Sequence, residues 1–174
     1  EYPEVKGINL EGPFLSASKC GAMPPQYLQK PSVDKFMQYQ KAANGFIRLV
    51  TVAPELPDAA AFVSEVADSG VVVSLGHSNA TADEVKRCLD AGAKSFTHFG
   101  NAMSQMDRLN LNMVGMAMSS DAYAEVIVDG KHVNRDVVKL LVKTKGINKV
   151  IGITDSIMAT GLADGNYTLG ATDV

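Results

Sequence analysis

Short apolar runs recur along this chain at intervals close to 25 residues, and this period limits its fold more than any other feature. The runs begin near residues 46, 71, 94, 124 and 149, so their separations are 25, 23, 30 and 25 residues. A strand, a helix and their connecting turns fill about 30 residues in a βαβ unit. The repeat therefore predicts parallel strands joined by helices.

The segments between these runs carry the signals of amphipathic helices. Apolar residues over 59–67 follow the helical i, i+3, i+4, i+7, i+8 spacing. The segment 81–84 reads Thr-Ala-Asp-Glu, which is the spacing of a capping box at a helix start. Helices are also predicted over 32–43 and from an N-cap at Asn134 to the residue before Gly146.

With the apolar run Val5–Leu10, the count of predicted strands is six. A closed TIM (β/α)₈ barrel has eight strands in about 250 residues, so we expect an α/β fold with an incomplete barrel of about six βα units. The alternative is an open doubly wound sheet, which binds its ligand where only a few strand ends meet. Here almost every strand end carries a reactive residue, and this favours the barrel.

We expect residues 1–174 to form a single, partial catalytic barrel domain of a longer protein, lacking the N-terminal strands, a small β domain and the C-terminal end. The first residues have neither an initiator Met nor the apolar segment of a signal peptide. Near the other end, Asp164-Gly165 is a turn signal before the strand-like segment 167–169. It predicts a hairpin or a return toward another subdomain.

Composition excludes several classes of function. The net charge is -3 with no basic block, which argues against nucleic acid as a partner. No apolar run approaches the roughly 18 residues of a membrane span. Cys20 and Cys88 lie far apart and belong to no metal-binding Cys pattern, so we expect reduced thiols in a cytoplasmic enzyme.

A potential metal ligand or proton-transfer group follows five of the predicted strands, and these five include every histidine of the chain. They are Glu11, His77, His98, His132 and Asp155. A parallel barrel collects the carboxyl ends of its strands on one face, where such side chains meet. The pattern therefore predicts an active site assembled from distant parts of the sequence.

Three of these residues fit the ligand set of a catalytic zinc ion, namely Glu11, His77 and His98. Asp155 is the predicted general acid or base, with a helix N-cap as its alternative role. His132 is open to three interpretations, which are a further ligand, a substrate contact and a loop residue, and we prefer the substrate contact. The glycines near these residues form no nucleotide-binding motif.

Five motifs together resemble those of the N-acetylglucosamine-6-phosphate deacetylases of the amidohydrolase superfamily. They are Leu10-Glu11-Gly12-Pro13-Phe14, Gly76-His77-Ser78-Asn79-Ala80-Thr81, Thr97-His98 with Asn101-Ala102-Met103, Asp129-Gly130-Lys131-His132-Val133 and Thr154-Asp155. They occur in order through essentially the whole chain. The resemblance implies a metal-dependent barrel enzyme that removes acetate from N-acetylglucosamine 6-phosphate.

The resemblance also implies roles for single residues. Glu11, His77 and His98 would hold a divalent metal, usually zinc, with iron, manganese or cobalt as alternatives. Asp155 would activate the metal-bound water and then protonate the departing amine. The predicted substrate contacts are Ala22, Asn101, Ala102 and His132, with Arg108 as the nearest candidate for the phosphate.

The sequence departs from the family pattern at two places. Met23 stands where family members commonly have His or Gln, and the segment 107–110 reads Asp-Arg-Leu-Asn instead of Arg-Glu-Pro-Gly. Another acetylated amino sugar is therefore an alternative substrate. A further alternative is an inactive, truncated barrel that associates through its open sheet edges. We expect little activity from the isolated chain and a homo-oligomer, a dimer or a tetramer, for the full-length protein.

Overall fold

The computed structural model describes residues 4–169 and 172–173. Its main sheet contains six parallel strands in the order β1-β2-β3-β4-β5-β6, which is also their order along the chain. The strands are β1 (Ile8–Leu10), β2 (Ile47–Val52), β3 (Val72–Leu75), β4 (Ser95–Phe96), β5 (Tyr123–Ile127) and β6 (Val150–Ile153). A doubly wound sheet reverses its strand order, and these six strands show no reversal.

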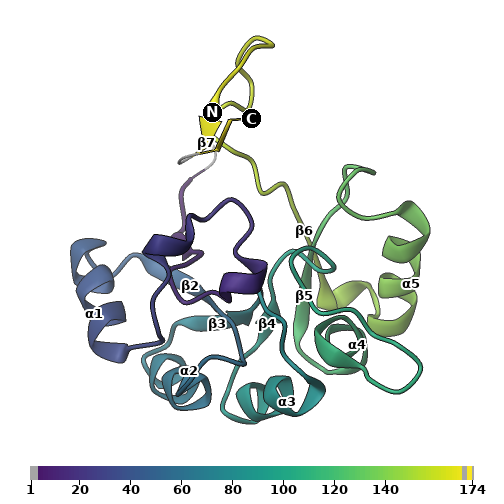
Figure 1. Cartoon of the computed structure of the whole chain (residues 1–174), viewed down its shortest axis with the longest axis horizontal. Coiled ribbons are helices and arrows are strands. Elements are labelled where there is room, and N and C mark those ends of the chain that lie inside the picture. The colour runs from purple at the N-terminus through teal and green to yellow at the C-terminus, as the bar shows by residue number, and fades with distance from the viewer. Residues whose placement is uncertain (1–3, 170–171, 174) are drawn as a thin grey trace.

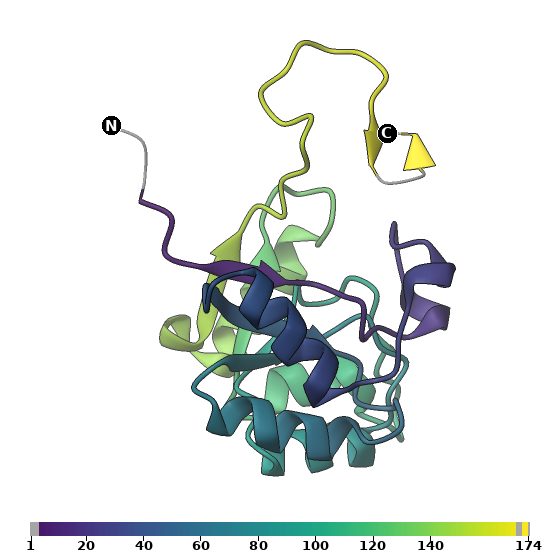
Figure 2. The ribbon, with the colours of Figure 1, turned by 90° about the vertical axis from the view of Figure 1, so that its left-hand side faces the viewer.

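Five α-helices cover the outer side of this curled sheet in an arc (Figures 1 and 2). They are α1 (Val33–Ala42), α2 (Ala59–Asp68), α3 (Ala82–Asp90), α4 (Asn112–Ser119) and α5 (Arg135–Lys145). Short 3₁₀ turns occupy Ala17–Lys19, Pro25–Tyr27 and Ile147–Lys149. The arrangement is a half-barrel, and it confirms the predicted incomplete TIM barrel.

The hydrophobic core lies between the sheet and the helices. The strands contribute fully buried side chains such as Val50, Leu75 and Phe96, and the helices contribute Phe62 from α2 and Leu141 from α5. Burying each large apolar side chain stabilises the fold by about 1.5–3 kcal/mol. The short strands are therefore held by their contacts with helices as well as by the sheet.

Helix starts agree with the predicted caps. The Thr81 hydroxyl accepts a hydrogen bond from the Glu84 N–H, and the Glu84 carboxylate accepts one from the Thr81 N–H, so the capping box is confirmed. The Asn134 side chain accepts from the Asp136 N–H at 2.8 Å and begins α5, which ends before Gly146 as predicted. These local signals thus predicted the ends of the helices to within one or two residues.

Helix α4 was not predicted, because the sequence gives no capping signal at its start. Its N-cap is Leu111, whose side chain forms no capping hydrogen bond, and Gly115 lies within the helix. A Cβ atom at Gly115 would lie only 2.8 Å from Leu111 Cβ. The glycine, which lowers helix propensity, is needed there for close packing.

The C-terminal segment forms a separate two-stranded sheet, in which β7 (Thr168–Leu169) pairs antiparallel with β8 (Thr172–Asp173). The predicted hairpin is present, but the Asp164-Gly165 turn precedes it and does not join its strands. These two strands belong to a sheet of their own, and Leu169 of β7 lines two cavities together with Glu11 and His77 of the half-barrel. Among the described residues, no helix has the length and apolar character that crossing a membrane requires.

The inner face of the sheet carries buried hydroxyl groups. Thr51 pairs in register with Ser74 on the next strand, and Ser74 pairs with Ser95. The Thr97 hydroxyl lies 2.9 Å from the Thr51 hydroxyl and donates to Ser74 Oγ at 2.7 Å. A polar cluster thus lies inside the barrel, next to the end of β4, where His98 follows.

Candidate metal centre

Three predicted metal ligands project from the carboxyl ends of three different strands. Glu11 follows β1 directly, and His77 and His98 each come two residues after the ends of β3 and β4. Both histidines have a left-handed backbone, with φ of 47° and 29°. His tolerates this conformation better than most residues, and it turns the chain sharply as it leaves the strand.

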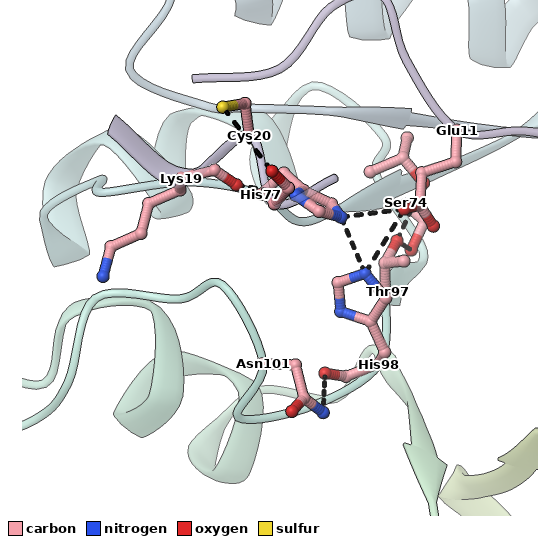
Figure 3. Close-up of polar contacts among 10 residues, drawn as sticks. Glu11, Lys19, Cys20, Ser74, His77, Thr97, His98 and Asn101 are labelled. Carbon is pink, nitrogen blue, oxygen red and sulfur yellow. Dashed lines mark hydrogen bonds and ion pairs between the residues drawn. The ribbon is translucent and has the colours of Figure 1, made fainter. Parts of the chain in front are cut away.

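The three side chains meet in one place (Figure 3). His77 Nε2 lies 2.8 Å from Glu11 Oε1, and His98 Nε2 lies 2.9 Å from His77 Nε2 and 3.5 Å from Glu11 Oε1. Their ligand atoms form a group within 4.8 Å of one another, as a shared metal ion requires. Ligands that bind one zinc ion tetrahedrally at 2.0–2.1 Å are about 3.3 Å apart, so this spacing fits an ion.

The protonation state of His77 also suits a metal. Its Nδ1 lies 2.6 Å from the backbone oxygen of Lys19, which can only accept a hydrogen bond. Nδ1 must therefore carry the proton, and the lone pair of the neutral ring is left on Nε2. That lone pair faces a carboxylate oxygen and the nitrogen of a second imidazole. A metal cation can bind all three of these ligand atoms at once.

The charges of the cluster are strongly coupled. Burial raises the pKa of Glu11, but its interactions with His77 and His98 outweigh this effect and lower the pKa to about 2. Burial lowers the pKa of His98, whereas its hydrogen bond and charge interaction with Glu11 raise it, and the net direction is upward. A negative charge on Glu11 is therefore favoured in this buried setting, and it is available to a cation.

One cavity of about 600 Å³ brings together most of the predicted site residues. Its walls include the three predicted ligands together with Ala22, Asn101, Ala102, His132 and Asp155. Arg108 does not line this cavity and is exposed in the loop before α4. Its assignment to a phosphate remains a prediction from the sequence.

Asp155 and His132 reach the cavity from the last two strands of the half-barrel. Asp155 follows β6 and has a left-handed backbone with φ of 49°. His132 Nδ1 lies 2.7 Å from Asp129 Oδ2, and the same Asp129 side chain accepts from the backbone N–H groups of Lys131 and His132. These hydrogen bonds hold the pKa of Asp129 well below its usual value and orient the His132 ring.

A second, mostly apolar cavity of about 280 Å³ adjoins the ligands Glu11 and His77. Its other lining residues are Leu15, Cys20, Ala22, Met23, Pro24 and Leu169. Met23 also packs over Gly12, where an added Cβ would lie 2.6 Å from the Met23 methyl carbon. Because Gly12 also has a φ of +83°, this position next to Glu11 strongly favours glycine.

Sequence reasoning missed two carboxylates near the site. Glu125 is buried on β5, and burial raises its pKa although hydrogen bonding from the His98 backbone opposes the shift. The sequence feature that could have revealed Glu125 is an acidic residue in the middle of an apolar strand. Glu55, just after β2, accepts hydrogen bonds from the residues that follow His77. The sequence feature that could have revealed it is its place close to a strand end, like the carboxylates of Glu11 and Asp155.

The sequence of the chain is similar to curated enzymes over nearly its whole length, although no family model matches it. N-acetylglucosamine-6-phosphate deacetylase of Bacillus subtilis (strain 168) is 37% identical over 172 residues, which are 98% of this chain and 43% of the relative. This chain is thus similar to N-acetylglucosamine-6-phosphate deacetylases over nearly all of its own length. The resemblance predicted from its motifs is thereby confirmed.

Solved structures show the same relationship. The chain matches N-acetyl-D-glucosamine-6-phosphate deacetylase from Mycobacterium smegmatis, solved as a variant in complex with N-acetyl-D-glucosamine-6-phosphate, with a TM-score of 0.91 and 38% identity over 96% of this chain and 44% of that one. The deacetylase from Thermotoga maritima matches with a TM-score of 0.87 and 33% identity, over 96% of this chain and 45% of that one. The chain thus spans less than half the length of these relatives.

A relative with a different sugar in its name is almost equally similar. N-acetylgalactosamine-6-phosphate deacetylase of Shewanella sp. (strain ANA-3) is 36% identical over 164 residues, which are 92% of this chain and 41% of the relative. The two sugars differ in the configuration of one hydroxyl group. Overall sequence identity therefore does not indicate which of the two sugar phosphates this chain resembles its relatives in binding, because the two kinds of relative are almost equally similar to it.

Proposed function

We propose that this chain is the metal-binding part of an enzyme that hydrolyses N-acetylglucosamine 6-phosphate to glucosamine 6-phosphate and acetate. The observation that carries the proposal is the convergence of Glu11, His77 and His98 at the mouth of the half-barrel, with ligand atoms within 4.8 Å of one another. We take residues 1–174 as one partial catalytic domain. The homo-oligomer and the cytoplasmic location remain predictions from the sequence.

The three ligands would hold one divalent ion, and zinc suits a set of two imidazoles and one carboxylate. When bound, this ion supplies a Lewis acid for the acetamide carbonyl. Asp155 lies on the wall of the same cavity and is the proton carrier. Its carboxylate takes a proton from the attacking water and transfers it to the nitrogen of the departing amine as the C–N bond breaks.

The remaining residues of the cavity bind and orient the sugar. His132 is held by Asp129 through Nδ1, so its Nε2 is left for the substrate. Asn101 and Ala102 form the wall next to His98 and would contact the sugar phosphate. Asn101 is itself fixed, because its side-chain amide donates to the His98 backbone oxygen at 3.1 Å. The substrate would thus lie between the ligand cluster and Asp155.

A second candidate substrate is N-acetylgalactosamine 6-phosphate, favoured by the Shewanella relative at 36% identity. Both reactions use the same acetamide chemistry and the same predicted ligands. A comparison of kcat/KM for the two sugar phosphates, with unphosphorylated N-acetylglucosamine as a third substrate, distinguishes these cases. Preference for the unphosphorylated sugar would count against the phosphate assignment.

The metal assignment is tested by ion content and deacetylation in the variants Glu11→Gln, His77→Ala and His98→Ala. Glu65→Gln, on the exposed side of α2, is the matched control because it also removes one carboxylate. We expect the control to retain one equivalent of zinc and each ligand variant to lose it. Retention of a full equivalent in all three ligand variants would refute the site.

Acetate release is best measured both in the 174-residue chain and in the natural polypeptide that carries it. We expect the ion to bind in both, because its ligands all closely follow β1, β3 and β4, which this chain contains. Turnover should be low in the chain alone, since a half-barrel leaves the cavity open on one side. Full turnover in the isolated chain would exclude the inactive, truncated barrel.

A further inference from the structure

A carboxylate outside the metal centre holds the loop that carries His77. Glu55 lies three residues after β2 and is half-buried. Its Oε2 accepts a hydrogen bond from the Ser78 hydroxyl at 2.6 Å, and its Oε1 accepts one from the Asn79 backbone N–H at 2.7 Å. Both oxygens are thus engaged by the two residues that directly follow a predicted metal ligand.

The partners of Glu55 require two acceptors from its side chain. Ser78 is fully buried, and its Oγ accepts from the Ala80 N–H at 2.9 Å, so its own proton is directed to Glu55. The Asn79 N–H is the second donor. A carboxylate presents two acceptor oxygens, whereas an amide presents one oxygen and an NH₂ group that faces one of these donors.

Ser78 also joins this loop to the loop that contains Ala102. The Ser78 N–H donates to the Ala102 oxygen at 2.9 Å, and the Ser104 N–H donates to the Ser78 oxygen at 3.0 Å. These bonds form a short parallel bridge between Ser78 and Met103. Contacts therefore run without interruption from Glu55 through Ser78 to a wall of the substrate cavity.

Both loops contain a backbone conformation that needs support. His77 has φ of 47° and Ala102 has φ of 49°. A left-handed conformation in a residue other than glycine persists where the surrounding structure enforces it. Ser78 is adjacent to the first of these residues and hydrogen-bonded to the second, so the contact with Glu55 supports both turns.

We propose that Glu55 is a positioning residue that fixes the His77 loop and the Asn101–Ala102 loop relative to each other. Glu55 does not line the cavity, and it acts through Ser78 and Asn79. The role rests on the proposed function, because both loops belong to the proposed active site. One contact would then influence metal affinity and substrate binding together.

The test compares Glu55→Ala and Glu55→Gln with Glu65→Ala, which removes an exposed carboxylate from α2. Zinc affinity is measured by competition with a chromophoric chelator, at a temperature where circular dichroism shows each variant folded. We expect Glu55→Ala to raise the Kd for zinc roughly 10-fold, the lower end of the effect of removing a group bonded to the ligand itself, because Glu55 acts through the residues that follow His77. Glu55→Gln should recover part of this loss because it keeps one acceptor.

Two further measurements separate positioning from general stability. The visible spectrum of bound Co²⁺ reports ligand geometry and should change in Glu55→Ala but not in Glu65→Ala. With N-acetylglucosamine 6-phosphate as substrate, KM should rise more than kcat falls, because the Asn101–Ala102 wall is displaced. A zinc Kd and a Co²⁺ spectrum equal to those of the control would overturn the proposal.

The metal measurements do not depend on turnover. Weakened zinc binding in Glu55→Ala, combined with no deacetylation by the unaltered full-length protein, would support the positioning role and refute the proposed function. Normal zinc binding in Glu55→Ala, combined with active unaltered protein, would refute the positioning role and leave the proposed function intact.

Discussion

Replacement of Thr97 by Val should destabilise the protein through the buried hydroxyl cluster on the inner face of the sheet. The Thr97 hydroxyl donates to Ser74 Oγ at 2.7 Å, so the contact with Thr51 at 2.9 Å must use the Thr51 proton. All three side chains are at most 1% exposed. Val has nearly the shape of Thr, so the substitution removes two hydrogen bonds and creates no cavity.

The magnitude follows from the two groups that lose their partners. Thr51 is left with a buried donor and Ser74 with a buried acceptor, and each such group costs about 1–3 kcal/mol. Because an acceptor tolerates this loss better than a donor, we expect the free energy of unfolding to fall by about 2–4 kcal/mol. The double variant Thr51→Val/Thr97→Val removes the unpaired donor and should regain about 1–2 kcal/mol relative to Thr97→Val.

The assay is equilibrium unfolding in urea followed by far-ultraviolet circular dichroism. A chelator should be present, because a metal that binds only the native state would add its own stabilisation. A Thr97→Val variant within 0.5 kcal/mol of the unaltered protein, roughly the change typical of a neutral surface substitution, would refute the reasoning. A double variant less stable than the single one would also refute it.

Three other predictions concern separate parts of the molecule. Asp155→Asn should keep its metal and reduce kcat by roughly 10²–10⁴, the loss typical of a proton-transfer group; unchanged turnover would exclude Asp155 as the proton carrier. Burial raises the pKa of the Cys88 thiol from 9.0 to about 11. The folded state therefore favours the neutral thiol, so Cys88 should contribute a fall in the free energy of unfolding as pH rises from about 9 to 11, and the fall should be smaller in Cys88→Ala. Thr81→Ala removes the capping box of α3 and should reduce stability by about 0.5–2 kcal/mol in urea, whereas Thr81→Ser should retain most of it.

Much of the fold was readable from local patterns. All six parallel strands begin within three residues of the predicted start of an apolar run, because the side chains that face the helices must be apolar. The helices with a capping residue, such as Thr81 or Asn134, were predicted with nearly correct bounds. Helix α4 was missed because its start has no side-chain cap and its centre contains Gly115, whose role is contact with Leu111.

Most of the residues that line the candidate site could also be predicted. A potential ligand or proton carrier directly after an apolar, strand-like run is easy to recognise in the sequence. Arg108 is the exception among the predicted site residues, because it lies in an irregular loop whose path no local pattern determines. Glu55 lies close to a strand end, but its supporting role was not predicted because its partners are the Ser78 hydroxyl and the Asn79 backbone N–H. The position of a carboxylate in the sequence does not show which distant groups it will bind.

The sequence by itself determined which residues can bind a metal and that they follow parallel strands, because strand period, helix caps and residue chemistry are local properties. Only the tertiary structure decided that Glu11, His77 and His98 meet within 4.8 Å and that Glu55 supports the loop behind them. The physical reason is that distances between strand ends depend on the curl of the whole sheet and on the left-handed turns that follow its strands. Those turns are imposed by long-range contacts, which act between segments far apart in the chain.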